Sequence, residues 1–212
     1  TDGRRPAGAF LPHIPVPDPT TGEMTLAVWH LPSKGKGLIL GERNFCGLFV
    51  TDTNQLAFTV RDPDLPANNP GSYFTVTDPN PLCSAASCEL TGSPAECNSA
   101  SNAGNWVFVA ATVHFDGTKS VLRLYRASFT DFGTAAVVMV AEANGPAKLL
   151  ADPLPALGGQ ISASHPAFGP VPAADTAGDN PLEGRVDDIR IYDRELKLVE
   201  LNALLNEPEY NP

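Results

Sequence analysis

Four cysteines are the side chains of this sequence with the clearest capacity for chemistry. Cys83, Cys88 and Cys97 lie in one segment rich in Ser, Ala, Pro and Asn, and Cys46 stands apart in an apolar run. We expect disulfides, which persist in oxidising compartments, but the sequence does not choose among the possible pairings. Zinc is the alternative, yet Cys-x4-Cys followed by a lone cysteine lacks a second close pair and a nearby histidine. The cysteines therefore favour a secreted, periplasmic or cell-surface protein.

The ionisable residues do not assemble a catalytic site at the level of sequence. The four histidines, His114 among them, are scattered along the chain, and we expect structural or solvated roles for them because no catalytic triad can be read from their spacing. Asp187 and Asp188 are adjacent, so a regular strand would direct their side chains to opposite faces. Glycoside hydrolysis needs two carboxylates that flank one bond. The sequence therefore predicts a protein that is not an enzyme.

Composition narrows the classes of partner. The formal net charge of -10 would repel a phosphate backbone, so we expect no binding to nucleic acid. No apolar run approaches the roughly 20 residues that cross a bilayer. The first residues lack the apolar segment of a signal peptide, which leaves a cytosolic protein or a mature form without its leader. Together with the cysteines, this favours the mature, extracytoplasmic form.

The elements that must position these residues are predicted to be strands. The chain has 18 glycines and 21 prolines, and 18% of its residues are charged, which is typical of many short strands separated by turns. Apolar and polar positions alternate with a period of two over residues 24–29. Asp116-Gly117 lies between two strand-like runs and predicts a hairpin turn. Further strands are predicted at 38–40, 47–51, 56–60, 73–76, 106–114, 120–126, 136–141 and 186–192, and another begins at 158–161.

One helix is predicted at the end of a single domain that spans residues 1–206, followed by an extended tail at 207–212. Leu198, Leu201 and Leu205 recur at the spacing of one helix face, and we expect this face to pack across an edge of the strands. The segment 61–105 loses the strand periodicity and contains three of the cysteines. A loop of this length is unusual in a compact domain, so we interpret it as a functional insertion.

The insertion supplies residue types that bind sugars. Tyr73 and Phe74 are candidate exposed rings, and Asn68 and Asn69 are candidate amide partners for a ligand. Trp29 and Trp106, in contrast, fall within predicted strands, where large rings mostly fill the core. The sequence therefore predicts a ligand-binding surface in the insertion.

The order of several motifs resembles the concanavalin A-like, laminin G-like jelly-roll domain. The motifs are Asp2-Gly3, the segments 24–29, 106–112, 122–125 and 157–159, and the closing block 184–194 with its Asp187-Asp188 pair. The resemblance implies an all-β fold: a two-sheet antiparallel β-sandwich with one short C-terminal helix. It also implies a carbohydrate-binding, adhesion or protein-interaction function, since members of the superfamily serve widely in these roles. Most members catalyse no reaction.

Further expectations come from the same resemblance. Some relatives hold a structural calcium ion, which implies Asp2 and Asp188 as ligands here, completed by backbone carbonyls and water. The β-glucanases of the superfamily carry Glu-x-Asp-x-x-Glu, a spacing absent from this chain. The family's first strand would lie before Thr1, which leaves a sheet edge open to pairing with another chain. Lys197 stands where the helix usually has a Ser or Thr cap.

Three functions are compatible with these observations. The first is a non-catalytic extracellular recognition or adhesion module that binds glycan or protein. The second is a structural subunit of a larger cell-surface or membrane-associated assembly, joined through its open edge. The third is a divergent glycoside hydrolase. We rank them in this order, and the sequence names neither the ligand nor the oligomeric state.

Overall fold

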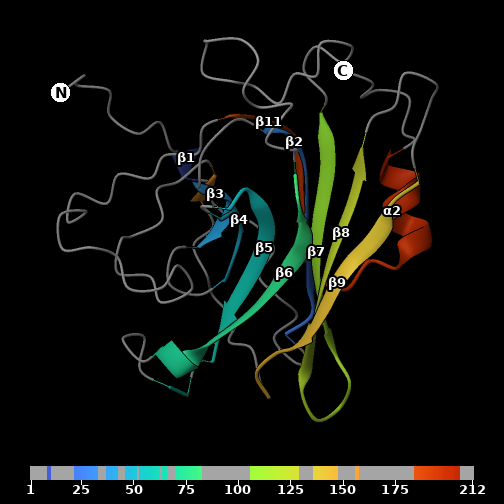
Figure 1. The fold of residues 1–212 in the computed structure, drawn as a ribbon. Coiled ribbons are helices and arrows are strands. Elements are labelled where there is room, and N and C mark those ends of the chain that lie inside the picture. The colour runs from blue at the N-terminus through green and yellow to red at the C-terminus, as the bar shows by residue number, and fades with distance from the viewer. Residues whose placement is uncertain are drawn as a thin grey trace, which may run out of the picture.

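The protein is a β-sandwich of two antiparallel sheets with a short α-helix near its C-terminus (Figure 1). This architecture comes from a computed structural model that describes residues 9–10, 22–32, 37–42, 46–51, 53–62, 64–65, 70–82, 106–128, 136–147, 156–157 and 184–205. The all-β sandwich predicted from the sequence is thereby confirmed.

The first sheet contains six strands in the order β1-β10-β3-β4-β5-β6. Their bounds are Ala9–Phe10 for β1, Ala156–Leu157 for β10, Gly37–Glu42 for β3, Cys46–Val50 for β4, Gln55–Arg61 for β5 and Tyr73–Pro81 for β6. A short 3-10 helix, Pro70–Ser72, leads directly into β6. Part of the predicted insertion is therefore a sheet strand.

The second sheet contains five strands in the order β11-β2-β7-β8-β9. Their bounds are Gly184–Tyr192 for β11, Met24–Pro32 for β2, Val107–Phe115 for β7, Ser120–Ser128 for β8 and Val138–Asn144 for β9. Helix α2 spans Leu198–Leu205. Strands close in sequence pair as hairpins, whereas β11 returns from the end of the chain to pair with β2.

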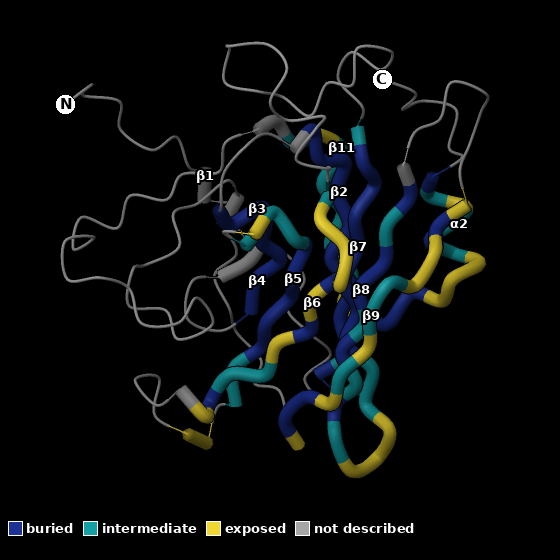
Figure 2. The backbone as a smooth tube through the Cα atoms, viewed as in Figure 1, coloured by how far each residue is buried: buried dark blue, intermediate teal, exposed yellow. Residues whose placement is uncertain are grey.

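The main core lies between the sheets, and the alternation of strand β2 explains how it forms. Met24, Leu26 and Val28 point inward and pack against apolar residues of the first sheet. The opposite face of β2 is also buried, since Ala27 and Trp29 belong to a second apolar cluster. Figure 2 shows that residues are buried along most of β2 and of its neighbour β7. The second sheet is therefore covered on both of its faces.

Helix α2 covers the outer face of the second sheet. Leu201 and Leu205 pack into the second apolar cluster, together with Trp29 of β2 and Phe108 of β7. The rings of Trp29 and Phe108 meet edge to face, with centroids 5.5 Å apart and an interplanar angle of 67°. The prediction of a core role for Trp29 is confirmed. The expected packing across an edge is wrong, because the helix contacts residues of central strands.

The predicted apolar face of the helix differs at its first residue. Leu198 is 45% exposed, whereas Leu201 and Leu205 are buried. Asn202 explains the orientation, because its side-chain oxygen accepts a hydrogen bond of 2.9 Å from the backbone N–H of Val137. That bond ties the helix to the segment entering β9. The expectation that Leu198 shares the buried face is therefore wrong.

An ion pair joins the two sheets at one side of the sandwich. Asp78 of β6 is fully buried, and its Oδ2 lies 3.1 Å from Nη1 of Arg126 in β8. The other carboxylate oxygen of Asp78 accepts a hydrogen bond of 2.9 Å from the backbone N–H of Asn80. Arg126 also donates to the carbonyl of Pro81, at 3.3 Å. One arginine thus connects the end of β6 to the opposite sheet.

The predicted hairpin between β7 and β8 is observed, and Asp116 organises its turn. One carboxylate oxygen of Asp116 accepts hydrogen bonds from the Thr118 hydroxyl at 2.7 Å and from the backbone N–H groups of Thr118 and Lys119, each at 2.9 Å. Gly117 has a φ of 95°, which an L side chain rarely adopts. The hydroxyl of Thr118 and the two N–H groups lower the pKa of Asp116 from 3.8 to about 2.

The substitution Asp116→Asn is expected to destabilise the protein at neutral pH and to have a smaller effect in acid. Because the folded-state pKa lies below the unfolded value, the charged carboxylate contributes stability above about pH 4 and loses it as the pH falls toward 2. Melting temperatures of both proteins at several pH values between these limits measure the difference. A gap that stays constant with pH would show that the charge is not responsible.

Candidate functional site

Strand β6 directs the side chains of Tyr73 and Phe74, the two aromatic residues predicted to bind a ligand, to opposite faces of the first sheet. Val76 is buried in the main core, and Phe74 packs against the same cluster. Alternate residues point to the opposite side, so Tyr73 and Thr75 face outward from the first sheet. Tyr73 is half-buried and Thr75 is exposed. The ring of Phe74 packs against the core. Of the two predicted aromatic residues, only Tyr73 therefore faces the side on which a ligand could bind.

Arg61 lies directly beside Tyr73 on this outer face. The two residues are register partners in the pairing of β5 with β6. Leu56, Phe58 and Val60 of β5 point into the core, which directs Arg61 outward. Its Nε atom is buried and has no hydrogen-bond partner, and no residue within the described ranges forms an ion pair with its guanidinium. Arg61 thus has an unsatisfied donor, Nε, that is closed to solvent in this structure.

The exposed Thr75 extends this surface, and the buried Thr59 lies beside it. We call the group the Arg61 patch and define it as Thr59, Arg61, Tyr73 and Thr75. Thr59 Oγ1 donates to the carbonyl of Phe74 at 3.1 Å and lies 3.0 Å from Thr75 Oγ1. A hydroxyl has one proton to donate, so Thr75 is the donor between the two. The oxygen of Thr75 can still accept from a ligand. The patch therefore combines a planar cation, a ring and a hydroxyl acceptor.

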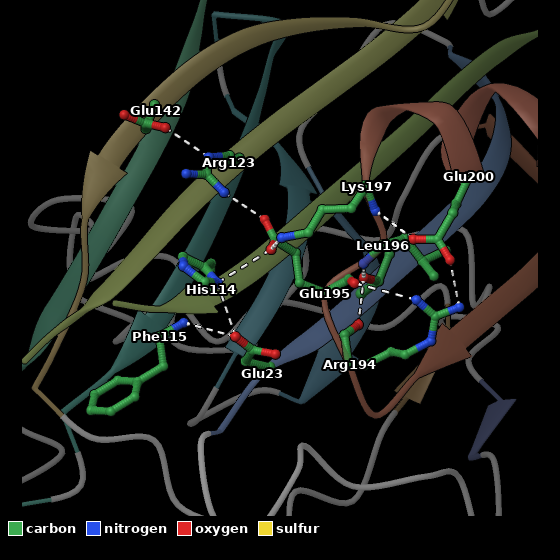
Figure 3. Close-up of polar contacts among 11 residues, drawn as sticks. Glu23, His114, Phe115, Arg123, Glu142, Arg194, Glu195, Leu196, Lys197 and Glu200 are labelled. Carbon is green, nitrogen blue, oxygen red and sulfur yellow. Dashed lines mark hydrogen bonds and ion pairs between the residues drawn. The ribbon is translucent and has the colours of Figure 1, made fainter. Parts of the chain in front are cut away.

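A second polar group, which we call the Glu195 cluster, lies on the outer face of the other sheet. It comprises Glu23, His114, Arg123, Glu142, Glu195 and Lys197 (Figure 3). The side chain of Glu195 is 3% exposed, and its Oε1 lies 2.5 Å from Nη1 of Arg123. Its Oε2 contacts Nζ of Lys197 and lies 3.2 Å from Nδ1 of His114. A buried carboxylate of this kind requires such cationic partners.

Thr25 holds the segment that carries Glu195 against the sheet. Its hydroxyl donates a hydrogen bond to the carbonyl of Arg194 and accepts one from the backbone N–H of Leu196, both of 2.8 Å. Register pairing places Thr25 beside Thr112 and Thr112 beside Arg123. The residues before the helix are thus aligned with a row of side chains across the sheet. Glu195 points into that row.

The start of helix α2 replaces the usual cap with an acidic side chain. Glu200 accepts a hydrogen bond of 2.8 Å from the backbone N–H of Lys197, which is half of a capping box. Its other oxygen lies 2.7 Å from Nη2 of Arg194. That hydrogen bond from Arg194 lowers the pKa of Glu200. The helix start is therefore stabilised although Lys197 is not a Ser or Thr.

Asp188 is engaged by a neighbouring arginine. The strand bulges between Asp187 and Arg190, and Asp188 has a φ of 46°. Its Oδ1 accepts from Nε of Arg190 at 2.9 Å, and its Oδ2 lies 2.8 Å from Nη2. Since a guanidinium binds both oxygens, Asp188 in this conformation does not fit a calcium ligand. Asp2 lies outside the described residues, so the calcium site stays a prediction.

Other predicted site residues also lie outside the described ranges. Cys46 is buried in β4, within the main core. The remaining cysteines and the two candidate amides cannot be placed, so the disulfides and the asparagine contacts stay predictions. The residues concerned are Cys83, Cys88, Cys97, Asn68 and Asn69.

Comparison with known proteins supports the architecture. No protein-family model matches the sequence, and no curated protein is significantly similar to it. The fold is similar to the crystal structure of a "putative carbohydrate binding protein" from Bacteroides ovatus, with a TM-score of 0.53 and 13% sequence identity. The match covers 93% of this chain and 43% of that chain. This likeness shows a shared fold. The chain spans less than half the length of that protein.

Helix α2 has 8 residues, and none of the helices in the described ranges is long and apolar enough to cross a bilayer.

Sequence reasoning did not single out Arg61 or the Glu195 cluster. Arg61 ends a strand in which Thr59 and Arg61 alternate with buried apolar residues, and this alternation is a signal for an outward-facing arginine. The members of the Glu195 cluster come from the segment before β2, from three strands and from the segment before α2. No local motif connects them.

Proposed function

We propose that this protein is a non-catalytic recognition module that binds carbohydrate at the Arg61 patch. The observation that carries the proposal is the buried Nε of Arg61, which has no hydrogen-bond partner. Arg61 lies beside Tyr73 on the neighbouring strand. The fold shared with a protein named as carbohydrate binding supports the class of ligand. The expected extracytoplasmic location, secreted, periplasmic or cell-surface, belongs to the same proposal.

The energetics of Arg61 favour a ligand. A buried donor without a partner costs about 1–3 kcal/mol, and a ligand oxygen that displaced the groups covering Nε would recover this free energy. Sugar hydroxyls and ring oxygens are suitable acceptors, and an aromatic ring offers an apolar surface for stacking. Arg61 and Tyr73 sit on paired strands, so their relative position is fixed before binding. A pre-formed site of this kind loses little entropy when a ligand binds.

The carboxylates of the Glu195 cluster do not support the hydrolase alternative. Glu23 and Glu195 approach the same histidine nitrogen. The side chain of Glu195, however, is 3% exposed and is neutralised by Arg123 and Lys197. A glycosidic oxygen would have to reach this carboxylate for proton transfer or attack. We therefore assign no catalytic role to this pair.

A glycan array followed by calorimetric titration tests the proposal. We expect a defined glycan to bind, and Arg61→Gln to weaken its affinity about tenfold or more, because a hydrogen bond from a charged donor contributes about 1.5–3 kcal/mol. Tyr73→Ala is expected to have a similar effect, whereas Tyr73→Phe retains the ring and most of the affinity. Arg194→Gln removes the same charge in the segment between β11 and α2 and serves as the control.

Two results would contradict this assignment. A glycan that binds the Arg61→Gln and Tyr73→Ala variants as well as the wild type would place the binding site elsewhere on the molecule. A protein that binds no glycan but copurifies with a stable protein partner would instead support the structural-subunit alternative.

A further inference from the structure

The Glu195 cluster contains a group of side chains whose arrangement suits a metal ion. Nδ1 of His114 lies 2.9 Å from Oε1 of Glu23 and 3.2 Å from Oε2 of Glu195. All three ligand atoms lie within 4.8 Å of one another. We propose that Glu23, His114 and Glu195 form a binding site for a divalent transition metal, with zinc as the preferred ion.

Two of the three distances between the ligand atoms are close to those between zinc ligands. Zinc binds nitrogen and oxygen at about 2.0–2.2 Å in a tetrahedral arrangement, which separates neighbouring ligand atoms by about 3.3 Å. The two contacts of His114 Nδ1 are 2.9 and 3.2 Å. Small side-chain rotations would therefore bring all three atoms onto one ion. Water would complete the coordination.

Nδ1 of His114 faces a carboxylate oxygen from Glu23 and another from Glu195. The two oxygens already accept hydrogen bonds from the backbone N–H of Phe115 and from Nζ of Lys197, and the imidazole nitrogen has at most one proton to share between them. A metal ion would instead bind the nitrogen lone pair and both oxygens. Two carboxylates also balance the charge of a divalent ion.

The choice of metal follows from the ligands. Imidazole suits zinc, copper, nickel and iron, whereas calcium and magnesium prefer oxygen ligands. The site offers one imidazole nitrogen and carboxylates from two residues, and sites with three protein ligands keep a position for water. A calcium site would need six to eight oxygens. The group therefore selects a transition metal over calcium.

Neighbouring residues already orient the ligands. Arg123 holds Oε1 of Glu195 at 2.5 Å and leaves Oε2 directed at His114. Glu142 fixes Arg123 in turn, at 2.7 Å. The backbone N–H of Phe115 donates to Oε1 of Glu23 at 3.3 Å. Figure 3 shows these contacts converging from several elements. Such outer partners orient the ligands before a metal ion binds.

Lys197 competes for the same oxygen. Its Nζ contacts Oε2 of Glu195, and its side chain is 64% exposed. A metal ion must displace this ammonium group, which can move into solvent on its flexible four-carbon stem. The substitution Lys197→Met is therefore expected to strengthen metal binding. A purely structural ion-pair network predicts no such gain.

Isothermal titration of the full chain with zinc chloride tests the site, with calcium and magnesium chloride as comparisons. We expect one zinc ion to bind at this site, and we expect His114→Gln and Glu23→Gln to weaken this binding at least about tenfold. Lys197→Met should tighten it. Asp64→Asn is the control, because Asp64 is an exposed carboxylate that follows β5 of the other sheet and belongs to no part of the Glu195 cluster, and it should change the affinity less than about threefold.

Several outcomes would overturn the site. Zinc binding that both His114→Gln and Glu23→Gln leave unchanged would place the ion on other ligands, such as cysteines. The absence of saturable zinc binding in the wild type and in Lys197→Met would show that no site exists. Stronger binding of calcium than of zinc would also contradict the proposal. Melting curves recorded without metal confirm that each variant is folded.

Discussion

Replacement of Arg123 with methionine is expected to lower the free energy of unfolding by about 2–3 kcal/mol. Arg123 pairs with Glu195, whose side chain is 3% exposed. Removing one partner of a buried pair leaves an uncompensated charge in a site of low polarity. His114 and Lys197 still contact Glu195, so we expect a loss at the lower end for such pairs. Urea denaturation at neutral pH measures the difference.

The exposed partner of Arg123 provides the matched control. Glu142 is 47% exposed and pairs with the same arginine at 2.7 Å. Exposed pairs contribute at most about 1 kcal/mol, so Glu142→Gln should have a small effect. The double variant Arg123→Met, Glu195→Gln should recover part of the stability, because the buried charge is gone. A single variant Arg123→Met as stable as Glu142→Gln would show that His114 and Lys197 suffice.

The substitution Leu201→Ala is expected to cost about 3 kcal/mol. Leu201 is fully buried in the cluster between helix α2 and the second sheet. Truncation of a buried leucine loses apolar contacts and leaves a cavity, with typical losses of about 2–5 kcal/mol. Chemical denaturation followed by circular dichroism measures the effect.

Val199 offers a control on the same helix. Its side chain is 76% exposed, and surface substitutions of this kind change stability by about 0.5 kcal/mol or less. Val199→Ala should therefore match the wild type closely. If Leu201→Ala proved as stable as Val199→Ala, the helix would not pack on the sheet in solution as the structure shows.

Much of the fold was predictable because strand periodicity is a local signal. The alternation at 24–29 and the Asp116-Gly117 turn predicted β2 and the β7–β8 hairpin, and both are present. The orientation of α2 was harder to predict from the sequence. Leu198 and Leu201 satisfy the same helical period, but the hydrogen bond from Val137 to Asn202 rotates Leu198 toward solvent. Such a tertiary contact leaves no trace in the periodicity.

The Arg61 patch was predictable only in part. Tyr73 was identified from its residue type, but Phe74 was predicted to be an exposed ring as well. The alternation of side chains along β6 separates Tyr73 from Phe74. Register between β5 and β6 places Arg61 beside Tyr73, and no local sequence signal specifies that register. The resemblance indicated the fold but no residue of this patch.

The Glu195 cluster could not be predicted from sequence at all. Glu23, His114 and Glu195 are far apart in the chain and meet because β2 pairs with β7 and because Thr25 holds the segment before α2. Each residue alone is an ordinary surface type. Only the pairing of strands brings two carboxylates to one imidazole.

The ion pair of Asp78 with Arg126 has a mechanical consequence for strand β6. Tyr73 begins this strand, and Asp78 near its other end is fastened to β8 of the opposite sheet. A force applied at Tyr73 by an immobilised ligand would therefore be transmitted along β6 to Asp78, and through Arg126 to the second sheet. To peel β6 away, a pulling force would have to break a shielded charge contact as well as the backbone ladder with β5.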